Sequence, residues 1–434
     1  MEDWHKLKPE LFKKQSYYLT GCDGYQCVMT VLDWEPLKRD CKMISKITST
    51  LAFLAFGICM IVPSVQAKEL HILSSYEADF VTRFFEDFSH RHPEISVFHL
   101  NKNTNAAVDE LISGNARQFD IFWASSSEAF ELLNQYARLT DLGYGMHADF
   151  AYSAVGWAWK SGTEMSPPLY WNDLLDPDYS GRITMSHPMR SGTTHSLIET
   201  ILQDRGWEAG WAYLLQLAGQ LKSISARSFG VLEGLGDRHD IGLTIDFLAL
   251  QRAVQNILFR YGRPIIISPA RVAALQGGKN PDAAKLFIDF LLSVDGQRVL
   301  LRPDIRRIPI NDEIRAELAE SLIPEMRAAL TFSWSRYDPE LARKRYWQVN
   351  EIFNIFIARD FLRRRDLWRR LHDLDAGAVQ DRAMITQILT HMPVTEASLR
   401  LAAPGGNTLL SWQAESTRLL DAAEARLHNA ELRK

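Results

Sequence analysis

The sequence predicts an α/β protein with two lobes, followed by a helical region that reaches the C-terminus. Short apolar runs alternate with amphipathic runs early in the chain, which is typical of a parallel sheet flanked by helices. Strand-like segments return near residues 264–274 after a separate α/β block, so the chain crosses between the lobes more than once. Residues 311–434 are charged and contain no convincing strand. Together these features predict a hinged cleft between two lobes.

The first lobe is predicted to begin with three strand–helix repeats. Strands are expected at residues 69–74, 95–100 and 119–123, and helices at 78–89, 105–112 and 128–136. Ligands of such sheets usually bind beyond the carboxyl ends of the strands. Hydroxyl clusters occupy two of these ends, with Ser74 and Ser75 after one strand and Ser125 and Ser126 after another. Each cluster could serve only a turn or a helix cap, but their matching positions favour a ligand site.

The second lobe is predicted to comprise residues 151–249. Its expected strands are residues 152–159, 182–186, 222–226 and 240–247, and its expected helices are 171–175, one that begins near 191, and 207–218. Strands at 264–268 and 271–274 and helices at 282–292 and 295–301 then complete the first lobe. The first lobe therefore comprises residues 68–150 plus 250–310, and residues 311–434 form the helical C-terminal region.

The segment His-Pro-Met-Arg-Ser-Gly-Thr-Thr-His at residues 187–195 is the strongest functional signal in the chain. Apolar residues follow it at helical spacing until Gly206, so its polar residues occupy a helix N-terminus. Free backbone N–H groups, hydroxyls and the helix dipole suit a phosphate, phosphonate or carboxylate group there. Ordinary N-capping is the alternative. The candidate ligand-binding residues in this segment are Arg190, Ser191, Gly192, Thr193, Thr194 and His195.

Three polar residues farther along the chain are also candidates. Arg227 and Ser228 follow a short predicted strand, and the planar guanidinium of an arginine matches phosphate or carboxylate oxygens. A simple surface arginine is the alternative interpretation. Asp246 is a charge inside an otherwise apolar predicted strand, so it should face the cleft or have a partner. We expect Asp246 to orient Arg227 or to bind an amine of the ligand.

Composition and motifs argue against several other functions. The formal net charge of −4 does not favour a nucleic-acid partner. His187, His195, Ser191 and Asp246 include the residue types of a hydrolytic triad. However, the chain has neither a Gly-x-Ser-x-Gly nucleophile motif nor a His-Glu-x-x-His zinc motif. The sequence therefore predicts no catalytic residue, no metal and no cofactor.

The N-terminal region indicates export. Residues 43–67 resemble a secretory signal peptide, with Lys46 before an apolar stretch at 51–62 and a small-residue cleavage pattern that ends at Ala67. Residues 1–42 are then expected to be a non-native upstream extension, with a cytoplasmic N-terminal extension as the alternative. All four cysteines precede residue 68, so the mature chain would have no disulfide and no thiolate metal site.

The C-terminal region contains an apolar stripe at residues 349–357, and an arginine-rich stretch at 359–370 follows it. Such a helix could bind a membrane surface or a partner protein. We expect instead that it packs its stripe against the protein and keeps its charges in solvent.

Several segments together resemble the bacterial extracellular solute-binding proteins of the type II periplasmic-binding-protein fold. These segments are His-Pro-x-Arg-Ser-Gly-Thr-Thr-His at 187–195, Gly-Trp-x-x-Gly-Trp at 206–211, Arg-Ser-Phe-Gly-Val at 227–231, Gly-Leu-Thr-Ile-Asp-Phe at 242–247 and residues 284–297. Within this family the chain resembles the phosphoglycerate transport regulatory proteins, over most of residues 68–434. Ferric-binding relatives use adjacent tyrosines near the hinge, and residues 246–249 contain none, which argues against iron.

The resemblance implies a monomeric periplasmic protein that captures a small phosphorylated or phosphonate anion. It would present this ligand to a membrane sensor kinase and so regulate phosphoglycerate uptake. The alternative is the binding component of an ABC transporter for phosphonate, carboxylate or, less favoured, iron(III), with a permease as partner.

Overall fold

The computed structural model describes residues 16–18, 28–30, 68–163, 165–238, 240–252, 255–318, 335–375, 377–399 and 404–433. The chain divides into two units, residues 1–64 and 65–434. In the first unit, β1 (Ser16–Tyr18) pairs antiparallel with β2 (Val28–Thr30). The predicted signal peptide at 43–67 lies outside the described residues, as does the rest of the predicted extension at 1–42.

One continuous sheet organises the second unit, in the strand order β4-β3-β5-β12-β7-β10-β8-β9. Strands β11 and β13 pair with β7, and β6 and β14 pair with β12. The strands are β3 (Lys68–Ser74), β4 (Ile95–Asn101), β5 (Ile121–Ala124), β6 (Leu139–Thr140), β7 (Ala148–Lys160), β8 (Ile183–Ser186), β9 (Leu221–Ser225), β10 (Ile241–Ile245), β11 (Ile257–Tyr261), β12 (Ile266–Leu275), β13 (Ile308–Pro309) and β14 (Ser335–Arg336).

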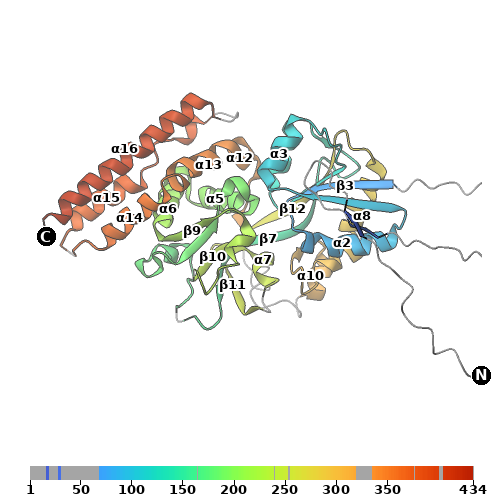
Figure 1. The fold of residues 1–434 in the computed structure, drawn as a ribbon, viewed down its shortest axis with the longest axis horizontal. Helices are drawn as coiled ribbons and strands as arrows, with labels where there is room; N and C mark the ends of the chain where they lie inside the picture. The colour runs from blue at the N-terminus through green and yellow to red at the C-terminus, as the bar shows by residue number, and fades with distance from the viewer. Residues whose placement is uncertain are drawn as a thin grey trace, which may run out of the picture. The chain divides into compact units, whose positions relative to one another are not determined.

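Helices follow most of these strands and also form the C-terminal region (Figure 1). The longer helices are α2 (Ala78–Arg91), α3 (Thr104–Ser113), α4 (Ser127–Gln135), α5 (Gly192–Arg205), α6 (Trp207–Gln220), α8 (Pro281–Leu292), α13 (Tyr346–Phe353), α14 (Phe361–His372), α15 (Val379–Thr390) and α16 (Gly406–Glu431). The shorter α-helices are α7 (Asp246–Leu250), α9 (Val294–Val299), α10 (Asp312–Leu318) and α12 (Pro339–Lys344). The other helical turns are η1 (Trp171–Leu175), η2 (Pro177–Tyr179), η3 (Pro188–Arg190), η4 (Ser228–Val231), η7 (Glu396–Ser398) and the π-helix η6 (Asn354–Ala358).

Two long strands join the two halves of the sheet. The first part of β7 pairs with β12, and its last part pairs with β10 and β11. Strand β12 pairs with β7 and also with β5, which belongs to the opening strand–helix repeats. The antiparallel β7–β12 pair therefore connects the half that contains β3, β4 and β5 to the half that contains β8, β9 and β10.

The predicted parallel opening is confirmed, because β3 pairs in parallel with both β4 and β5. Several strands differ from the prediction. The strand expected at 240–247 ends at Ile245, and Asp246 begins α7. The two strands expected at 264–268 and 271–274 are one strand, β12, and β11 was not expected. The two-residue β14 lies in the region predicted to contain only helices.

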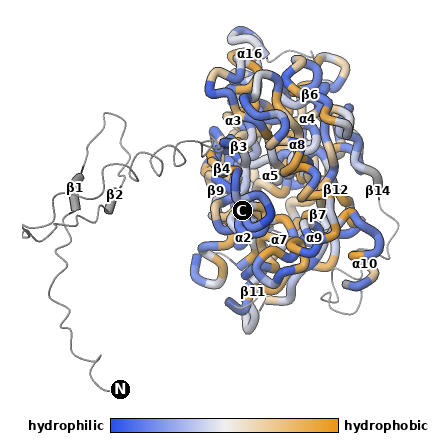
Figure 2. The backbone as a smooth tube through the Cα atoms, turned by 90° about the vertical axis from the view of Figure 1, so that its right-hand side faces the viewer, coloured by the Kyte–Doolittle hydropathy of each residue, from blue (hydrophilic) through white to orange (hydrophobic). Residues whose placement is uncertain are grey.

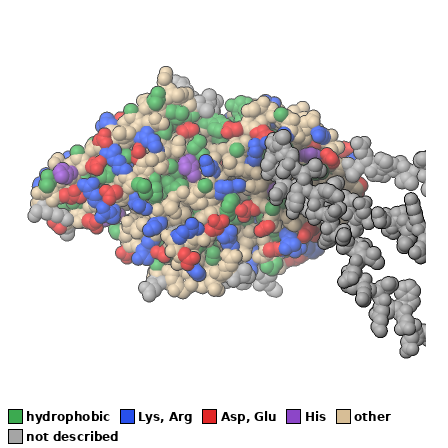
Figure 3. Space-filling view, viewed as in Figure 1, with side chains coloured by type: hydrophobic (Ala, Val, Ile, Leu, Met, Phe, Trp, Pro, Cys, Tyr) green, Lys and Arg blue, Asp and Glu red, His purple; other side chains and the backbone are tan. Residues whose placement is uncertain are grey.

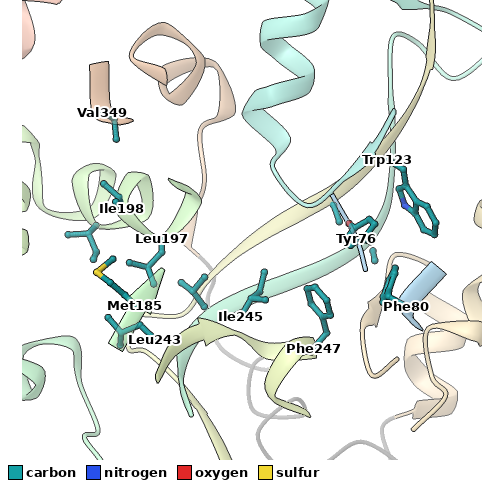
Figure 4. Packing of buried hydrophobic residues seen from close by; sticks show 14 of the residues in the cluster. Tyr76, Phe80, Trp123, Met185, Leu197, Ile198, Leu243, Ile245, Phe247 and Val349 are labelled. Carbon is teal, nitrogen blue, oxygen red and sulfur yellow. The ribbon is translucent and has the colours of Figure 1, made fainter. Parts of the chain in front are cut away.

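The core lies on both faces of the β7–β12 junction. Figure 4 shows Tyr76, Phe80, Trp123 and Phe247 gathered on one side, while Leu197, Ile198, Leu243 and Ile245 pack together on the other. All of them are buried. In Figure 2, hydrophobic segments of the backbone tube gather around α5 and α8 in the middle of the view. Both helices contribute buried residues to the same cluster, so one apolar core supports the two halves.

Helices α14 and α15 of the C-terminal region pack on α6, in the second half of the sheet, whereas α12 packs on α4 of the first half. The predicted apolar stripe is buried, since its five members are each at most 1% exposed: Val349, Ile352, Phe353, Phe356 and Ile357. Trp368 of α14 packs against Gly219 of α6. Helices α14, α15 and α16 share a separate apolar cluster. None of the helices among the described residues is long and apolar enough to span a membrane.

The arginines of α14 are mostly engaged within this region. Arg363 pairs with Asp421 and Glu424 of α16, and Arg370 pairs with Glu431. Arg364 is buried and donates to the carbonyl oxygen of Leu389. Figure 3 shows basic and acidic side chains intermixed over the end of the molecule where α14 to α16 lie. The stripe packs as expected, and many of the charges pair with each other instead of standing alone in solvent.

Candidate ligand-binding cavity

A cavity of about 560 Å³ lies where the N-terminus of α5 faces the carboxyl ends of β3 and β5. It collects residues from segments that are far apart in the sequence. The lining residues are Ser75, Tyr76, Glu77, Asp79, Phe80, Thr82, Arg83, Asn103, Thr104, Ser125, Arg190, Ser191, Gly192, Thr193, Arg227, Ser228, Phe229, Phe247, Leu248, Gln251, Arg252, Gln255 and Asp304. Both halves of the sheet therefore contribute to one site.

The N-terminus of α5 forms one wall, and Ser191 is its cap. The Ser191 Oγ accepts from the backbone N of Thr194 at 3.1 Å, and it also bonds the Ser228 Oγ at 2.9 Å. The first intrahelical bond runs from the N of His195 to the O of Ser191. The N–H groups of Gly192 and Thr193 therefore have no acceptor within the helix. They lie at the positive end of the helix dipole, where an anion is favoured.

Gly192 allows α5 to approach the first half of the sheet closely. A Cβ atom at this position would lie 2.8 Å from the Cβ of Ser126 and 2.8 Å from the Oγ1 of Thr104. Any larger residue would push the helix N-terminus away from the opposite wall. The glycine thus brings the backbone donors of α5 close to the residues that follow β4 and β5.

Arg227 lies beside this helix terminus, half-buried at the start of η4. Its Nη1 donates to the Oδ1 of Asn101 at 2.9 Å, and its guanidinium stacks at 5.0 Å from the Phe229 ring centroid. Burial lowers the pKa of Arg227, while the carboxylate of Glu77 raises it. One described hydrogen bond leaves most of the guanidinium donors available to a ligand.

Arg190 adds a second cation on the same side. It ends the short turn η3, directly before the cap of α5, and its side chain is exposed. No described hydrogen bond or ion pair engages its guanidinium among the residues that the structure covers. Arg190, Arg227 and the α5 terminus therefore converge on one region with unused positive charge and N–H donors.

Some predicted site residues lie behind the cavity wall. Thr194 is buried and bonds the hydroxyls of Ser186 and Ser191. His195 is fully buried, and its Nδ1 lies 3.0 Å from the Oδ1 of Asn350. On the opposite side, Ser74 is buried against His99, and Ser126 hydrogen-bonds Glu128. These residues support the wall and do not line it.

Asp246 is also absent from the lining, and its partners differ from those expected. It is fully buried at the start of α7 and accepts from the N of Ala154 at 2.9 Å and the N of Phe247 at 2.7 Å. The Tyr261 hydroxyl donates to it at 3.2 Å. Burial raises the pKa of Asp246 to about 6, although these hydrogen bonds and Arg307 lower it. Asp246 thus fixes the β7–α7 junction, and no described contact joins it to Arg227.

Several lining residues were not expected from the sequence. Asn103 caps α3 by accepting from the N of Ala106 at 2.9 Å, which is an ordinary capping pattern that gave no functional signal. Glu77 lies two residues after Ser75, and burial raises its pKa although Arg252 and Arg227 lower it. Arg83 is paired with Asp304 at 2.6 Å. Tyr76 directly follows Ser75 and could have been included by position.

Among the described residues, no group of three or more His, Cys, Asp or Glu side chains is arranged to hold a metal ion.

Both a protein family and a characterised relative are similar to this chain in sequence. Residues 158–331 match the model of a family described as bacterial extracellular solute-binding protein. The phosphoglycerate transport regulatory protein PgtC of Salmonella typhimurium is 28% identical over 370 residues, which cover 79% of this chain and 89% of the relative.

Solved periplasmic binding proteins share the fold at low sequence identity. The periplasmic binding protein AfuA of Actinobacillus pleuropneumoniae, solved with fructose-6-phosphate, superposes with a TM-score of 0.52 at 17% identity, over 57% of this chain and 86% of that one. The apo ferric ion-binding protein A of Pasteurella haemolytica gives 0.56 at 12% identity, over 66% and 97%. The chain is therefore similar to the bacterial extracellular solute-binding proteins, and it has the type II periplasmic-binding-protein fold with a helical C-terminal region.

Proposed function

We propose that this protein captures a small phosphorylated or phosphonate anion, with phosphoglycerate as the leading candidate. The observation that carries the proposal is the convergence of the free N–H groups of Gly192 and Thr193 with Arg190 and Arg227 on one cavity. A tetrahedral oxyanion can accept hydrogen bonds from all of them at once. The relationship to PgtC supports phosphoglycerate as the ligand class.

In this proposal the protein works in the periplasm and does no covalent chemistry. Ser191 and Ser228 hold the helix terminus in place, and Ser75 contributes a hydroxyl from the opposite wall, where Ser125 orients Tyr76. Ligand binding favours one arrangement of the two halves, which a membrane partner then recognises. We propose a membrane sensor kinase as this partner, through which the protein regulates phosphoglycerate uptake; the relative PgtC is named as a regulator of that transport.

The main alternative is a binding protein that delivers the ligand to an ABC permease. A substrate-binding protein of an ABC transporter from Agrobacterium tumefaciens shares the fold, with a TM-score of 0.54. Neighbouring genes separate the two roles. A kinase, a response regulator and a single-polypeptide transporter support sensing, whereas a permease and an ATPase support delivery.

Calorimetric titration of residues 68–434 tests the ligand assignment. The panel contains 3-phosphoglycerate, phosphoenolpyruvate, an aminoalkylphosphonate, inorganic phosphate and ferric citrate. We expect tight binding of one organic phosphate or phosphonate without its consumption. Absence of binding by folded protein to every phosphorus-containing member would overturn the proposal.

Arg227→Ala tests the proposed site itself. The variant should weaken binding by about 1.5–3 kcal/mol, the usual cost of losing a hydrogen bond to a charged group. Arg238→Ala is the matched control, because Arg238 is exposed, comes from the same half of the sheet and does not line the cavity. Equal affinities of the two variants for the ligand would remove Arg227 from the site.

A further inference from the structure

Arg307 is a buried cation directly behind the cavity. It is only 1% exposed, and its guanidinium lies 4.3 Å from the ring centroid of Phe247 and 5.3 Å from that of Tyr76. The rings of Phe80 and Phe150 also surround it. Burying a guanidinium among aromatic rings is costly unless its charge is compensated. The burial of Arg307 at this cost therefore suggests that its charge has a function.

The charge of Arg307 is only partly compensated within the described residues. No acidic side chain among them forms an ion pair with it within 4.0 Å, and its Nε has no hydrogen-bond partner there. The carboxyl that acts on it electrostatically is Asp246, whose own contacts go to Ala154, Phe247 and Tyr261. A negative group of a ligand in the adjacent cavity would therefore be attracted to the charge of Arg307.

The hydrogen bonds of Arg307 lead to the cavity. Its Nη1 donates to the Tyr76 hydroxyl at 2.9 Å, and its Nη2 donates to the Ser125 Oγ at 3.3 Å. Ser125 in turn donates to the Tyr76 hydroxyl at 3.0 Å. The Tyr76 oxygen thus accepts two hydrogen bonds, so its own proton is left for another acceptor. Tyr76 and Ser125 both line the cavity.

We propose that Tyr76, positioned by Arg307 and Ser125, forms a second subsite that donates a hydrogen bond to a carboxylate at the far end of the ligand. This inference rests on the proposed function, in which Arg227 and the α5 terminus hold the phosphorus group. The ligand class is then a phosphate or phosphonate that also carries a carboxylate. The two subsites come from opposite halves of the sheet, so such a ligand bridges them.

The geometry selects a carboxylate over an amine at this subsite. Tyr76 presents a donor there, because its acceptor positions are occupied by Arg307 and Ser125. A carboxylate would lie one hydroxyl group away from the buried guanidinium and be attracted to its charge. A protonated amine would instead face the Tyr76 donor, with the Arg307 cation behind it, and both would repel it.

Two ligands that differ in one group test the subsite by calorimetry: 3-phosphoglycerate and glycerol 3-phosphate, which lacks the carboxylate. The wild-type protein should prefer phosphoglycerate. Tyr76→Phe should weaken phosphoglycerate binding by about tenfold or more, as for a hydrogen bond to a charged group, and should change glycerol phosphate binding by less than about twofold. Ser125→Ala should shift the preference in the same direction by a smaller factor.

Tyr136→Phe is the control, because Tyr136 is 41% exposed and does not line the cavity. Arg227→Ala should weaken both ligands equally, since it acts on the shared phosphate. Equal losses of both ligands in Tyr76→Phe, or no loss of phosphoglycerate, would overturn the second subsite while Arg227→Ala still tested the first. If the folded wild-type protein bound neither ligand, this subsite would be refuted, and the proposed function would depend on the other phosphorus-containing compounds of the calorimetric panel.

Discussion

The polar residues around the cavity divide into those that face it and those that hold it in shape. Arg190, Arg227 and Thr193 line the cavity, whereas Thr194 and His195 are buried one helical turn or less behind the α5 terminus. The reason is the geometry of a helix start. Residues at N1 and N2 present free N–H groups outward, while the next side chains turn toward the core.

The sequence predicted a ligand site at the α5 terminus but could not predict which of its residues line the cavity. The Ser-Gly-Thr-Thr pattern after Arg190 predicts a helix N-terminus, because capping chemistry and helical spacing are local. Which side chain turns into the cavity depends on packing across the sheet, as the buried contact of His195 with Asn350 shows. Arg307 gave no local signal at all, since its function depends on Tyr76, which is 231 residues away.

Asp246 should make stability depend on pH. Its pKa is about 6 in the folded protein against 3.8 for an ordinary aspartate. Between these values the folded chain keeps the proton that the unfolded chain has released, so stability falls as the pH rises. In urea unfolding from pH 4 to pH 7, the free energy of unfolding of wild type should fall relative to Asp246→Asn by roughly 2–3 kcal/mol.

The comparison with Asp246→Asn cancels the titration of the other acidic residues. Most of the change should occur between about pH 4 and pH 6. A difference between the two proteins that stays constant with pH would mean that Asp246 titrates normally in the folded chain.

At the scale of elements, sequence patterns predicted periodic segments well and boundaries less well. Strands β3, β4 and β5 and helices α2 and α3 lie within a few residues of their expected ranges. The error at 240–247 arose because a buried apolar run has no periodicity that separates a strand from a helix. Strand β11 was missed although Ile257, Phe259 and Tyr261 alternate with more exposed residues.

The packing of α6 on α14 depends on one glycine. A Cβ atom at Gly219 would lie 2.4 Å from the Cγ and 2.7 Å from the Cβ of Trp368. Because the Trp368 Cβ is fixed to the backbone of α14, rotation of the ring cannot relieve the overlap. Gly219→Ala should therefore lower the free energy of unfolding by about 1–3 kcal/mol despite the better helix propensity of alanine.

Limited proteolysis should then cut the Gly219→Ala variant faster within α14 to α16 than elsewhere. Gly377→Ala is the matched control, because a Cβ at Gly377 meets nothing within 4 Å. Equal melting temperatures of the two variants would show that α14 adjusts to the added methyl group at little cost.

At the scale of the whole molecule, residues 337–350 connect the C-terminal region to both halves of the sheet. The Tyr337 hydroxyl donates to the Oε2 of Glu128 in α4 at 2.8 Å. Tyr346 donates to Asn105 in α3. Arg345 pairs with Glu199 in α5 at 2.8 Å. Helices α3 and α4 follow strands of the first half, whereas α5 belongs to the second. The C-terminal region thus braces the two halves on the side where α5 approaches α3 and α4.

Substitutions in the Arg345–Glu199 pair test how much charge pairing contributes to this contact between the C-terminal region and the sheet. Glu199 is fully buried and Arg345 is 3% exposed, so losing one partner leaves an uncompensated buried charge. Arg345→Met should lower the free energy of unfolding by about 3–5 kcal/mol in chemical denaturation.

Adding Glu199→Leu to Arg345→Met should recover most of this loss, because an apolar pair of similar volume avoids the desolvation cost of two ions. Arg369→Met is the control, since the pairs of Arg369 with Asp366 and Asp373 are exposed to solvent and should contribute little to stability. If the double variant were no more stable than Arg345→Met, the cost would come from lost packing of the arginine. Packing, and not ion pairing, would then hold the C-terminal region against the two halves of the sheet.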